Sequence, residues 1–306
     1  MRALLLRLIC LLSLLIAASA VTRVMRGRSP ALSFAIIAAL NLFAFRSAQG
    51  ITYTFVDLTP SGIIYSEAHG VSGGQQVGFG DGPATGNAYH AMLWSGSASS
   101  AVDLNPAGFT ASEALGVSGG QQVGDGGGPA TRYAQHALLW SGSAASVVDL
   151  NPLGFGASKA FGISGAHQVG YGYVGNGPDA HALLWSGSSS SAVDLNPAGF
   201  TASEALGVSG GQQVGDGYIN NSLYPRALLW SGTAASVVDL QSYLSSDYTK
   251  SKAVAIDAAG DIVGAAVYGP TGLYHAIEWI AVVPEPSTGP LVIAGLLGLA
   301  WRRARA

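Results

Sequence analysis

Cysteine and charge are the two features that this sequence has least of. Its 306 residues include one cysteine, Cys10, and charged residues make up 10% of the chain. Because Cys10 lies in an apolar N-terminal run, no disulfide framework is available to stabilise the rest. Low charge, 49% hydrophobic residues and 43 glycines exclude a charge-rich disordered chain. They are typical of many short strands joined by tight turns.

Basic residues are scarce in the middle of the chain. All 17 acidic residues lie between Asp57 and Glu285, where only five of the 14 basic residues are found, which gives this part a formal charge of −12. A surface that acidic repels phosphate backbones, so nucleic acid is not expected as a partner. The other nine basic residues precede residue 51 or follow residue 300, beside apolar runs. The positive-inside rule predicts that these basic clusters stay in the cytoplasm.

Residues 1–50 read as an export signal region. Arg2, a leucine-rich run and Ala18-Ser19-Ala20 supply the positive, apolar and cleavage regions of a signal peptide. Residues 25–50 repeat this plan, so Met25 is an alternative start, or the first segment is an uncleaved anchor. A single buried helical hairpin is the remaining alternative.

The middle of the chain repeats one unit five times. A strand-like word of five residues ends each time in tryptophan, with spacings of 46, 45, 45 and 49 residues. A Val-Asp-Leu word recurs at the same period. Residues 100–126 and 191–217 are identical over 27 positions. A fixed period in the forties predicts a solenoid or a propeller. The tryptophans are Trp94, Trp140, Trp185, Trp230 and Trp279.

Each unit contains four strand-like words, which predicts one four-stranded propeller blade per repeat. The array opens with a Val-Asp-Leu word in residues 52–58 and closes with a tryptophan word in residues 275–280. Elsewhere these two words form a hairpin, so pairing them would close a ring of five blades. An open solenoid would instead need polar caps at both ends of the array, and the sequence shows none. We therefore expect an all-β, five-bladed β-propeller of about 45-residue repeats over residues 51–282, flanked by helical terminal segments.

The repeats resemble the HAF-type extracellular repeats, named for a His-Ala-Phe word. The word stands here as His-Ala-Met, His-Ala-Leu and His-Ala-Ile before the tryptophan, and Arg226 departs from it in the fourth unit. The resemblance covers the whole repeat region. It implies an exported bacterial protein and carries no established activity.

Residues 283–306 form a tail with three elements in order. A stiff Pro-Glu-Pro peptide precedes an apolar run at 289–301, which is short for a membrane span, and a basic end follows. This order resembles the PEP-CTERM sorting signal of Gram-negative bacteria. The resemblance implies processing by an exosortase, a membrane enzyme, and delivery to the cell surface or exopolysaccharide matrix. The alternative is a chance proline-rich linker before a tail anchor. The sorting residues are Val283, Pro284, Glu285, Pro286, Ser287, Thr288, Arg302, Arg303 and Arg305.

Candidate chemistry in the repeats is limited. His90, His136, His181 and His275 hold equivalent positions, which suits either a ring of metal ligands or a repeated hydrogen bond. Residues 125–128 lack the alternating acids of a calcium loop, and no phosphate loop or paired-cysteine motif is present. We expect no metal and no cofactor.

The acidic positions offer little more. The Val-Asp-Leu aspartates suit turns, where a carboxylate accepts backbone N–H groups. Glu67, Glu113 and Glu204 share a position that Lys159 and Lys252 fill in the other units, and a pair of these carboxylates would serve a glycosidase. Residues copied from unit to unit are a poor source of the distinct roles that catalysis needs.

The loops expected before each tryptophan motif vary in sequence while their flanks repeat; they span residues 79–89, 125–135, 171–180, 216–225 and 265–274. They carry tyrosines that form a possible ligand rim for sugar rings or a protein partner. The alternative is that tyrosines cover the blade ends. The rim residues are Tyr89, Tyr133, Tyr171, Tyr173, Tyr218, Tyr224, Tyr268 and Tyr274.

The sequence therefore predicts an exported, non-catalytic surface or matrix protein. Its expected partners are the export machinery, an exosortase-type enzyme and exopolysaccharide, with transient inner-membrane association through both termini. A carbohydrate- or protein-binding propeller is the first alternative, and a secreted polysaccharide-active enzyme is the second.

Overall fold

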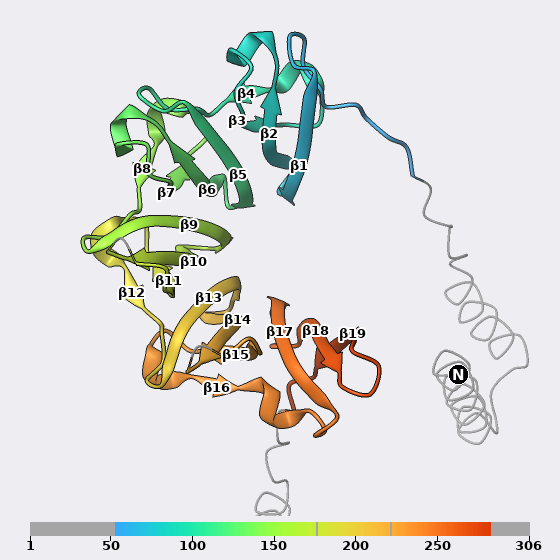
Figure 1. The fold of residues 1–306 in the computed structure, drawn as a ribbon. Coiled ribbons are helices and arrows are strands. Elements are labelled where there is room, and N and C mark those ends of the chain that lie inside the picture. The colour runs from blue at the N-terminus through green and yellow to red at the C-terminus, as the bar shows by residue number, and fades with distance from the viewer. Residues whose placement is uncertain (1–52, 176, 221, 283–306) are drawn as a thin grey trace, which may run out of the picture. The chain divides into compact units, whose positions relative to one another are not determined.

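The computed structural model describes residues 53–175, 177–220 and 222–282 (Figure 1). The export signal region and the sorting residues predicted from the sequence lie outside these ranges. The chain divides into two compact units, Met1–Phe55 and Val56–Ala306. The described end of the first unit, residues 53–55, is exposed and has no regular secondary structure. Everything that follows concerns the second unit.

The described residues of the second unit form five antiparallel sheets, one for each repeat, in which each strand pairs with the next along the chain. Four sheets have four strands and the fifth has three. The strands of the first two sheets are β1 (Tyr65–Ser72), β2 (Gln75–Asp81), β3 (His90–Trp94), β4 (Val102–Asp103), β5 (Ala111–Ser118), β6 (Gln121–Gly127), β7 (His136–Trp140) and β8 (Val148–Asp149). Those of the other three are β9 (Phe155–Ser164), β10 (His167–Val174), β11 (Ala180–Trp185), β12 (Val193–Asp194), β13 (Phe200–Ser209), β14 (Gln212–Ile219), β15 (Arg226–Trp230), β16 (Val238–Asp239), β17 (Tyr248–Ile256), β18 (Ile262–Tyr268) and β19 (Leu273–Trp279).

The helices among the described residues are single 3-10 turns between strands. They are η1 (Pro83–Thr85), η2 (Ala98–Ser100), η3 (Pro129–Thr131), η4 (Ala144–Ser146), η5 (Ser189–Ser191), η6 (Ala234–Ser236) and η7 (Leu240–Tyr243). In this part of the chain, no helix has the length and apolar character that a membrane crossing requires.

Glycines make the hairpins possible, both in the turn and where the two strands approach each other closely. At the β5–β6 turn, Gly119 and Gly120 have φ of 57° and 81°, the left-handed values that a two-residue turn between antiparallel strands requires. Gly124 in β6 lies against the bulge in β5, where a β-carbon would stand 1.9 Å from the carbonyl oxygen of Glu113. Only glycine fits there, which explains why every repeat has glycine at this position.

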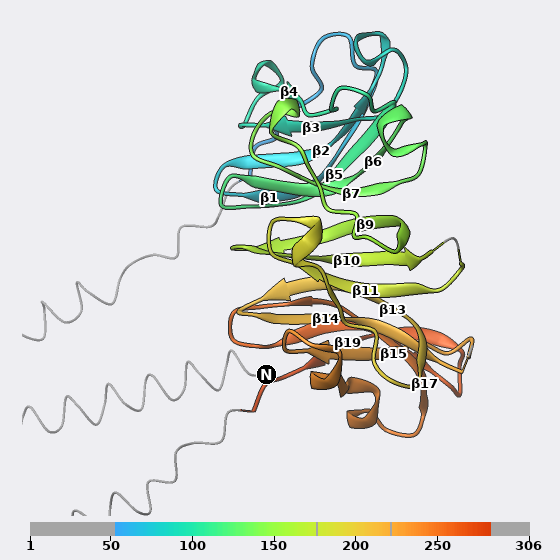
Figure 2. The ribbon, with the colours of Figure 1, turned by 90° about the vertical axis from the view of Figure 1, so that its left-hand side faces the viewer.

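The sheets pack face to face in chain order, and the first strands of neighbouring sheets lie side by side (Figures 1 and 2). Four hydrophobic clusters join successive sheets. In the first of them, Leu104 of the first sheet packs with Trp140 of the second, and both are buried completely. The equivalent pairs Leu150–Trp185 and Leu195–Trp230 belong to the next two clusters. The leucine of each Val-Asp-Leu word thus anchors the tryptophan of the following sheet.

The prediction of an all-β fold with one sheet per repeat is confirmed. The prediction of four strands per sheet is confirmed for the first four sheets. The predicted pairing of the opening word with the closing word is absent from the described residues. Val56, Asp57 and Leu58 lie outside any strand, and β19 pairs with β18 alone. Leu58 instead packs against the cluster of the first sheet that contains Trp94, as the leucine of a preceding sheet would.

Candidate functional site

The recurring histidines each pair with an aspartate of their own sheet. His90, His136 and His181 place Nδ1 at 2.7 Å from Oδ2 of Asp103, Asp149 and Asp194 respectively. In the fourth sheet, Arg226 replaces histidine and its Nε donates to Asp239 Oδ2 at 2.7 Å. Each pair ties the third strand to the short fourth strand, a local role that the sequence left open beside metal binding.

The second oxygen of each aspartate stabilises the turn that follows. Asp103 Oδ1 accepts the backbone N–H of Asn105 at 2.8 Å, and Asp149 and Asp194 do the same for Asn151 and Asn196. This confirms the turn role that the sequence predicted for these aspartates. Within the described ranges no group of three or more histidine, cysteine or acidic side chains is placed to hold a metal ion.

The predicted tyrosine rim divides into separate groups. Tyr89 packs edge-on against Phe79, with ring centroids 4.9 Å apart. The ring centroids of Tyr171 and Tyr173 are 5.4 Å apart, and those of Tyr268 and Tyr248 are 5.6 Å apart. No ring contact links these three groups in the part of the chain that the structure describes.

The loop boundaries predicted for the rim are wrong. Five of its tyrosines lie inside strands. Four of them lie in second strands, which continue beyond the repeated glycine to pair with the long first strand, and Tyr274 lies in the third strand of the fifth sheet. Only three rim residues lie in loops: Tyr89, Tyr133 and Tyr224. The rim residues within strands are Tyr171, Tyr173, Tyr218, Tyr268 and Tyr274.

The second and third sheets meet at a charged cluster around Lys159. Its Nζ lies 2.9 Å from Asp125 Oδ1 and 3.4 Å from Glu113 Oε2, so one lysine of the third sheet contacts two carboxylates of the second. The Asp125 side chain is only 3% exposed and that of Lys159 is 19% exposed. Gln135 donates a hydrogen bond from Nε2 to the other Asp125 oxygen, Oδ2. We name these four residues the Lys159 cluster.

Burial and charge oppose each other in the Lys159 cluster. Burial is the largest effect on Asp125 and raises the pKa of its carboxyl, although the nearby Lys159 ammonium lowers it. Burial is also the largest single effect on Lys159 and lowers its pKa, but the Asp125 and Glu113 carboxylates together raise it above the ordinary value. The resting state is therefore an ion pair held at a site with little water.

The fourth and fifth sheets carry a looser copy of this cluster. Lys252 Nζ stands 3.5 Å from Asp216 Oδ1, and the lysine side chain is 44% exposed. Burial raises the pKa of Asp216 to about 6, with Lys252 opposing it and Glu204 adding to it. The two copies arise from the identical segments 100–126 and 191–217, but the lysines that meet them differ in exposure.

One motif was missed in the sequence. Gly-x-Ser-x-Gly, the word around a hydrolase nucleophile, occurs at residues 70–74, 116–120 and 207–211. In the structure each copy forms the tight turn between the first two strands of a sheet, and no helix follows it. A nucleophile elbow requires a strand-to-helix turn, so these serines belong to hairpins.

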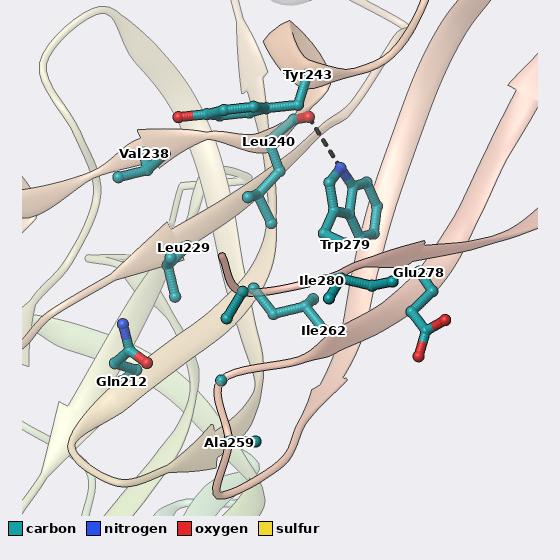
Figure 3. A pocket seen from close by; sticks show the side chains of 12 residues that line it. Gln212, Leu229, Val238, Leu240, Tyr243, Ala259, Ile262, Glu278, Trp279 and Ile280 are labelled. Carbon is teal, nitrogen blue, oxygen red and sulfur yellow. Dashed lines mark hydrogen bonds between the residues drawn. The ribbon is translucent and has the colours of Figure 1, made fainter. Parts of the chain in front are cut away.

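A groove of about 670 Å³ lies beside the fifth sheet (Figure 3). Trp279 lines it, and its Nε1 donates to the Leu240 carbonyl oxygen at 3.1 Å. Ile262, Ile280 and Glu278 line the same groove. The tryptophans of the other four sheets are buried almost completely, whereas Trp279 is partly exposed. Among the described residues the fifth sheet has three strands, and the groove lies beside Trp279 of its last one.

Comparison with known proteins gives no family. No protein-family model matches the chain, and a search of curated proteins finds no match. Among solved structures, a crystal structure of a puromycin hydrolase mutant complexed with PGG is similar over 78% of this chain, with 14% identity and a TM-score of 0.47. The match spans 40% of that chain. A likeness at this level assigns neither a fold nor an activity.

Proposed function

We propose that this protein is an exported, non-catalytic scaffold, displayed at the bacterial surface or in the exopolysaccharide matrix after an exosortase-type enzyme has processed its tail. The observation that supports a scaffold role is the repeated His–Asp pair, which has the same 2.7 Å geometry in three sheets. The recurring polar side chains hold strands and turns in place. Catalysis would need groups with distinct roles.

The scaffold is a five-bladed propeller that closes through its own opening segment. Among the described residues, His275 of β19 has no aspartate partner and its Nδ1 lies 3.4 Å from the Tyr248 hydroxyl, while Asp57 pairs with no histidine. In the other sheets these two positions pair. Residues 56–58 therefore supply the missing fourth strand of the fifth sheet, with Asp57 beside His275.

The backbone pattern between sheets supports the same closure. The amides of Ala91, Ala137, Ala182 and Ala227 each donate to a serine hydroxyl of the following sheet at 2.9–3.0 Å. Ala276 of the fifth sheet and Ser66 of the first are the repeat equivalents that remain without this bond in the described structure. In a closed ring these two groups would form the same hydrogen bond between the fifth sheet and the first.

The free faces of the first and fifth sheets also expose apolar side chains at the positions that are buried between the other sheets. Val71 of the first sheet is 74% exposed, whereas its equivalent Val117 is buried. Val263 of the fifth sheet is 48% exposed, whereas Val214 is buried completely. Burying such side chains is worth roughly 25 cal/mol per Å² of apolar surface. Closure brings these two faces together.

A disulfide trap tests the closure. In β3–β4, Leu93 lies opposite Val102, so Glu278 should lie opposite Val56. In a Cys10→Ser background, the full chain carrying Val56→Cys and Glu278→Cys should form an intramolecular disulfide on mild oxidation. Ile277→Cys with Val56→Cys is the matched control, because adjacent strand residues point to opposite faces. A result in which only dimers or free thiols form would overturn the closed ring.

Sorting has its own test, which is mass spectrometry of the C-terminus of the protein recovered from the cell surface. The proposal requires a new C-terminus near Pro284-Glu285-Pro286. Surface material that still ends in Arg305-Ala306 would contradict processing, whatever the state of the ring.

A binding role for the aromatic groups is the second candidate. It is favoured by the exposed rings of Tyr65 and Tyr89 beside Phe79, and by Tyr274, whose ring lies 5.5 Å from Lys250 Nζ. Exposed tyrosines stack on sugar rings. A glycan array would support this role if binding depended on Tyr89 and Tyr274, and an array without binding would remove it.

A further inference from the structure

The Lys159 cluster contains the groups of a condensation reaction at contact distance. An amine nitrogen, Lys159 Nζ, stands 2.9 Å from Oδ1 of a carboxyl group, and a second carboxylate, Glu113, lies 3.4 Å from the same nitrogen. Asp125 Oδ1 is buried and accepts no hydrogen bond of normal geometry in the described residues, so the ion pair with Lys159 is its polar contact. Asp125 Oδ2 is held by Gln135.

We propose that Lys159 and Asp125 form an intramolecular amide bond that joins the third sheet to the second, with Glu113 as the proton carrier. The inference is independent of export, sorting and ring closure, because it concerns two neighbouring sheets in the middle of the described chain. It would give the repeat region, which contains no cysteine, a covalent cross-link of the kind that disulfides provide elsewhere.

The reaction balances within the cluster. A proton first moves from the Lys159 ammonium to Asp125 Oδ1, which leaves a neutral amine and a neutral carboxylic acid without any external acid or base. The Nζ–Cγ bond then forms, and Gln135 Nε2–H stabilises the charge that develops on Oδ2. Glu113 takes one proton from the nitrogen and passes it to the Oδ1 hydroxyl. The Cγ–Oδ1 bond breaks, one water molecule leaves, and Glu113 is a carboxylate again.

Burial favours this condensation over the reverse hydrolysis. Asp125 is 2% exposed, so the product amide has little access to water. Phe161 lies beside the reacting nitrogen, with its ring centroid 5.9 Å from Nζ. Burial acts against the charged form of both reactants, although the two carboxylates together keep the pKa of Lys159 above its ordinary value.

The Lys252 copy provides an internal control. Its aspartate and glutamate come from the identical segment, but Lys252 is more exposed and its Nζ stands 3.5 Å from Asp216. Water therefore has access to that nitrogen. We expect no amide bond there.

Peptide mapping of the full-length protein tests the proposal. After denaturation and trypsin digestion, the folded protein should yield one branched peptide that contains Asp125 and Lys159, is lighter than its two parts by one water molecule, and is not cleaved after Lys159. Cleavage after Lys252 should be complete. Release of linear peptides at both lysines from protein that had folded would overturn the proposal.

Variants separate the roles. Lys159→Arg keeps the ion pair but removes the nucleophile, so the branched peptide should vanish and trypsin should cleave at that position. Glu113→Gln keeps both reacting groups and should abolish or greatly slow bond formation. Glu204→Gln, the same change in the other copy, should leave the branched peptide unchanged. Equal yields in the two glutamine variants would assign Glu113 no part in the reaction, and would contradict that element of the proposal.

Discussion

Leu58 packs against the buried cluster that contains Trp94, although Leu58 precedes every strand of the sheet to which Trp94 belongs. In the other sheets the same contact joins a tryptophan to the leucine that ends the sheet before it. The first sheet is thus packed as though a sheet preceded it. Among the residues that the structure describes, the fifth sheet lacks the strand that Leu58 would end, and these two facts form the core of the closed-ring proposal.

Replacing Leu58 by alanine should therefore destabilise the fold although the residue lies outside any strand. Truncating a partly buried leucine should lower the free energy of unfolding by about 1–2 kcal/mol, and by about 2–5 kcal/mol if closure buries it fully. Val56→Ala, at an exposed neighbour, should change stability by about 0.5 kcal/mol or less in the described structure. Chemical denaturation measures both. A Leu58→Ala protein as stable as the parent would show that the contact with Trp94 contributes nothing.

Gly124→Ala should destabilise far more than a glycine substitution in a nearby turn. The added methyl group would stand 1.9 Å from the Glu113 carbonyl oxygen, so the β5–β6 pair must distort, at a cost of about 3 kcal/mol or more. At Gly119 the methyl group meets no atom within 4 Å, and only the left-handed backbone resists it, at about 1 kcal/mol. Thermal unfolding of the two variants gives the comparison, and equal losses would contradict the close approach of these strands.

Asp216 should make stability depend on pH. Its folded pKa of about 6 lies above the ordinary value of 3.8, so the native state binds more protons than the unfolded state between these values. Stability contributed by the protonated form is present below about pH 3.8 and is lost as the pH rises through about 6. Asp216→Asn should remove this decline. Denaturation midpoints measured from pH 4 to 7 test it, and an unchanged slope in the variant would assign the decline to other groups.

The sequence carries most of the fold because the fold is local. Each repeated motif makes contacts within its own repeat or with the next one, so the period predicts one sheet per unit. These motifs are the tryptophan strand around Trp140, the Gly-Gly turn and Val-Asp-Leu. The boundaries were less predictable. Asp125 was expected at the start of a loop because the sequence varies from there to the next tryptophan motif, but β6 continues to Gly127 since β5 supplies a partner along that length.

The Lys159 cluster was beyond sequence reasoning. The shared position of Glu113 and Lys159 was visible, but the approach of Lys159 to Asp125 depends on how closely two sheets pack and on which side chains reach across the seam. The same holds for His275, whose equivalents pair with aspartates while its own neighbour is Tyr248. Distances between elements are set by packing, and one sequence does not display them.

The measurement that tests the closed ring most directly is a double-mutant cycle between Asp57 and His275. Asp57→Ala, His275→Ala and the double variant are unfolded in denaturant beside the parent, with Asp149 and His136 as the matched pair that the structure shows at 2.7 Å. A closed ring predicts a coupling free energy of about 1 kcal/mol for both pairs. Coupling for Asp149 and His136 with none for Asp57 and His275 would contradict the account.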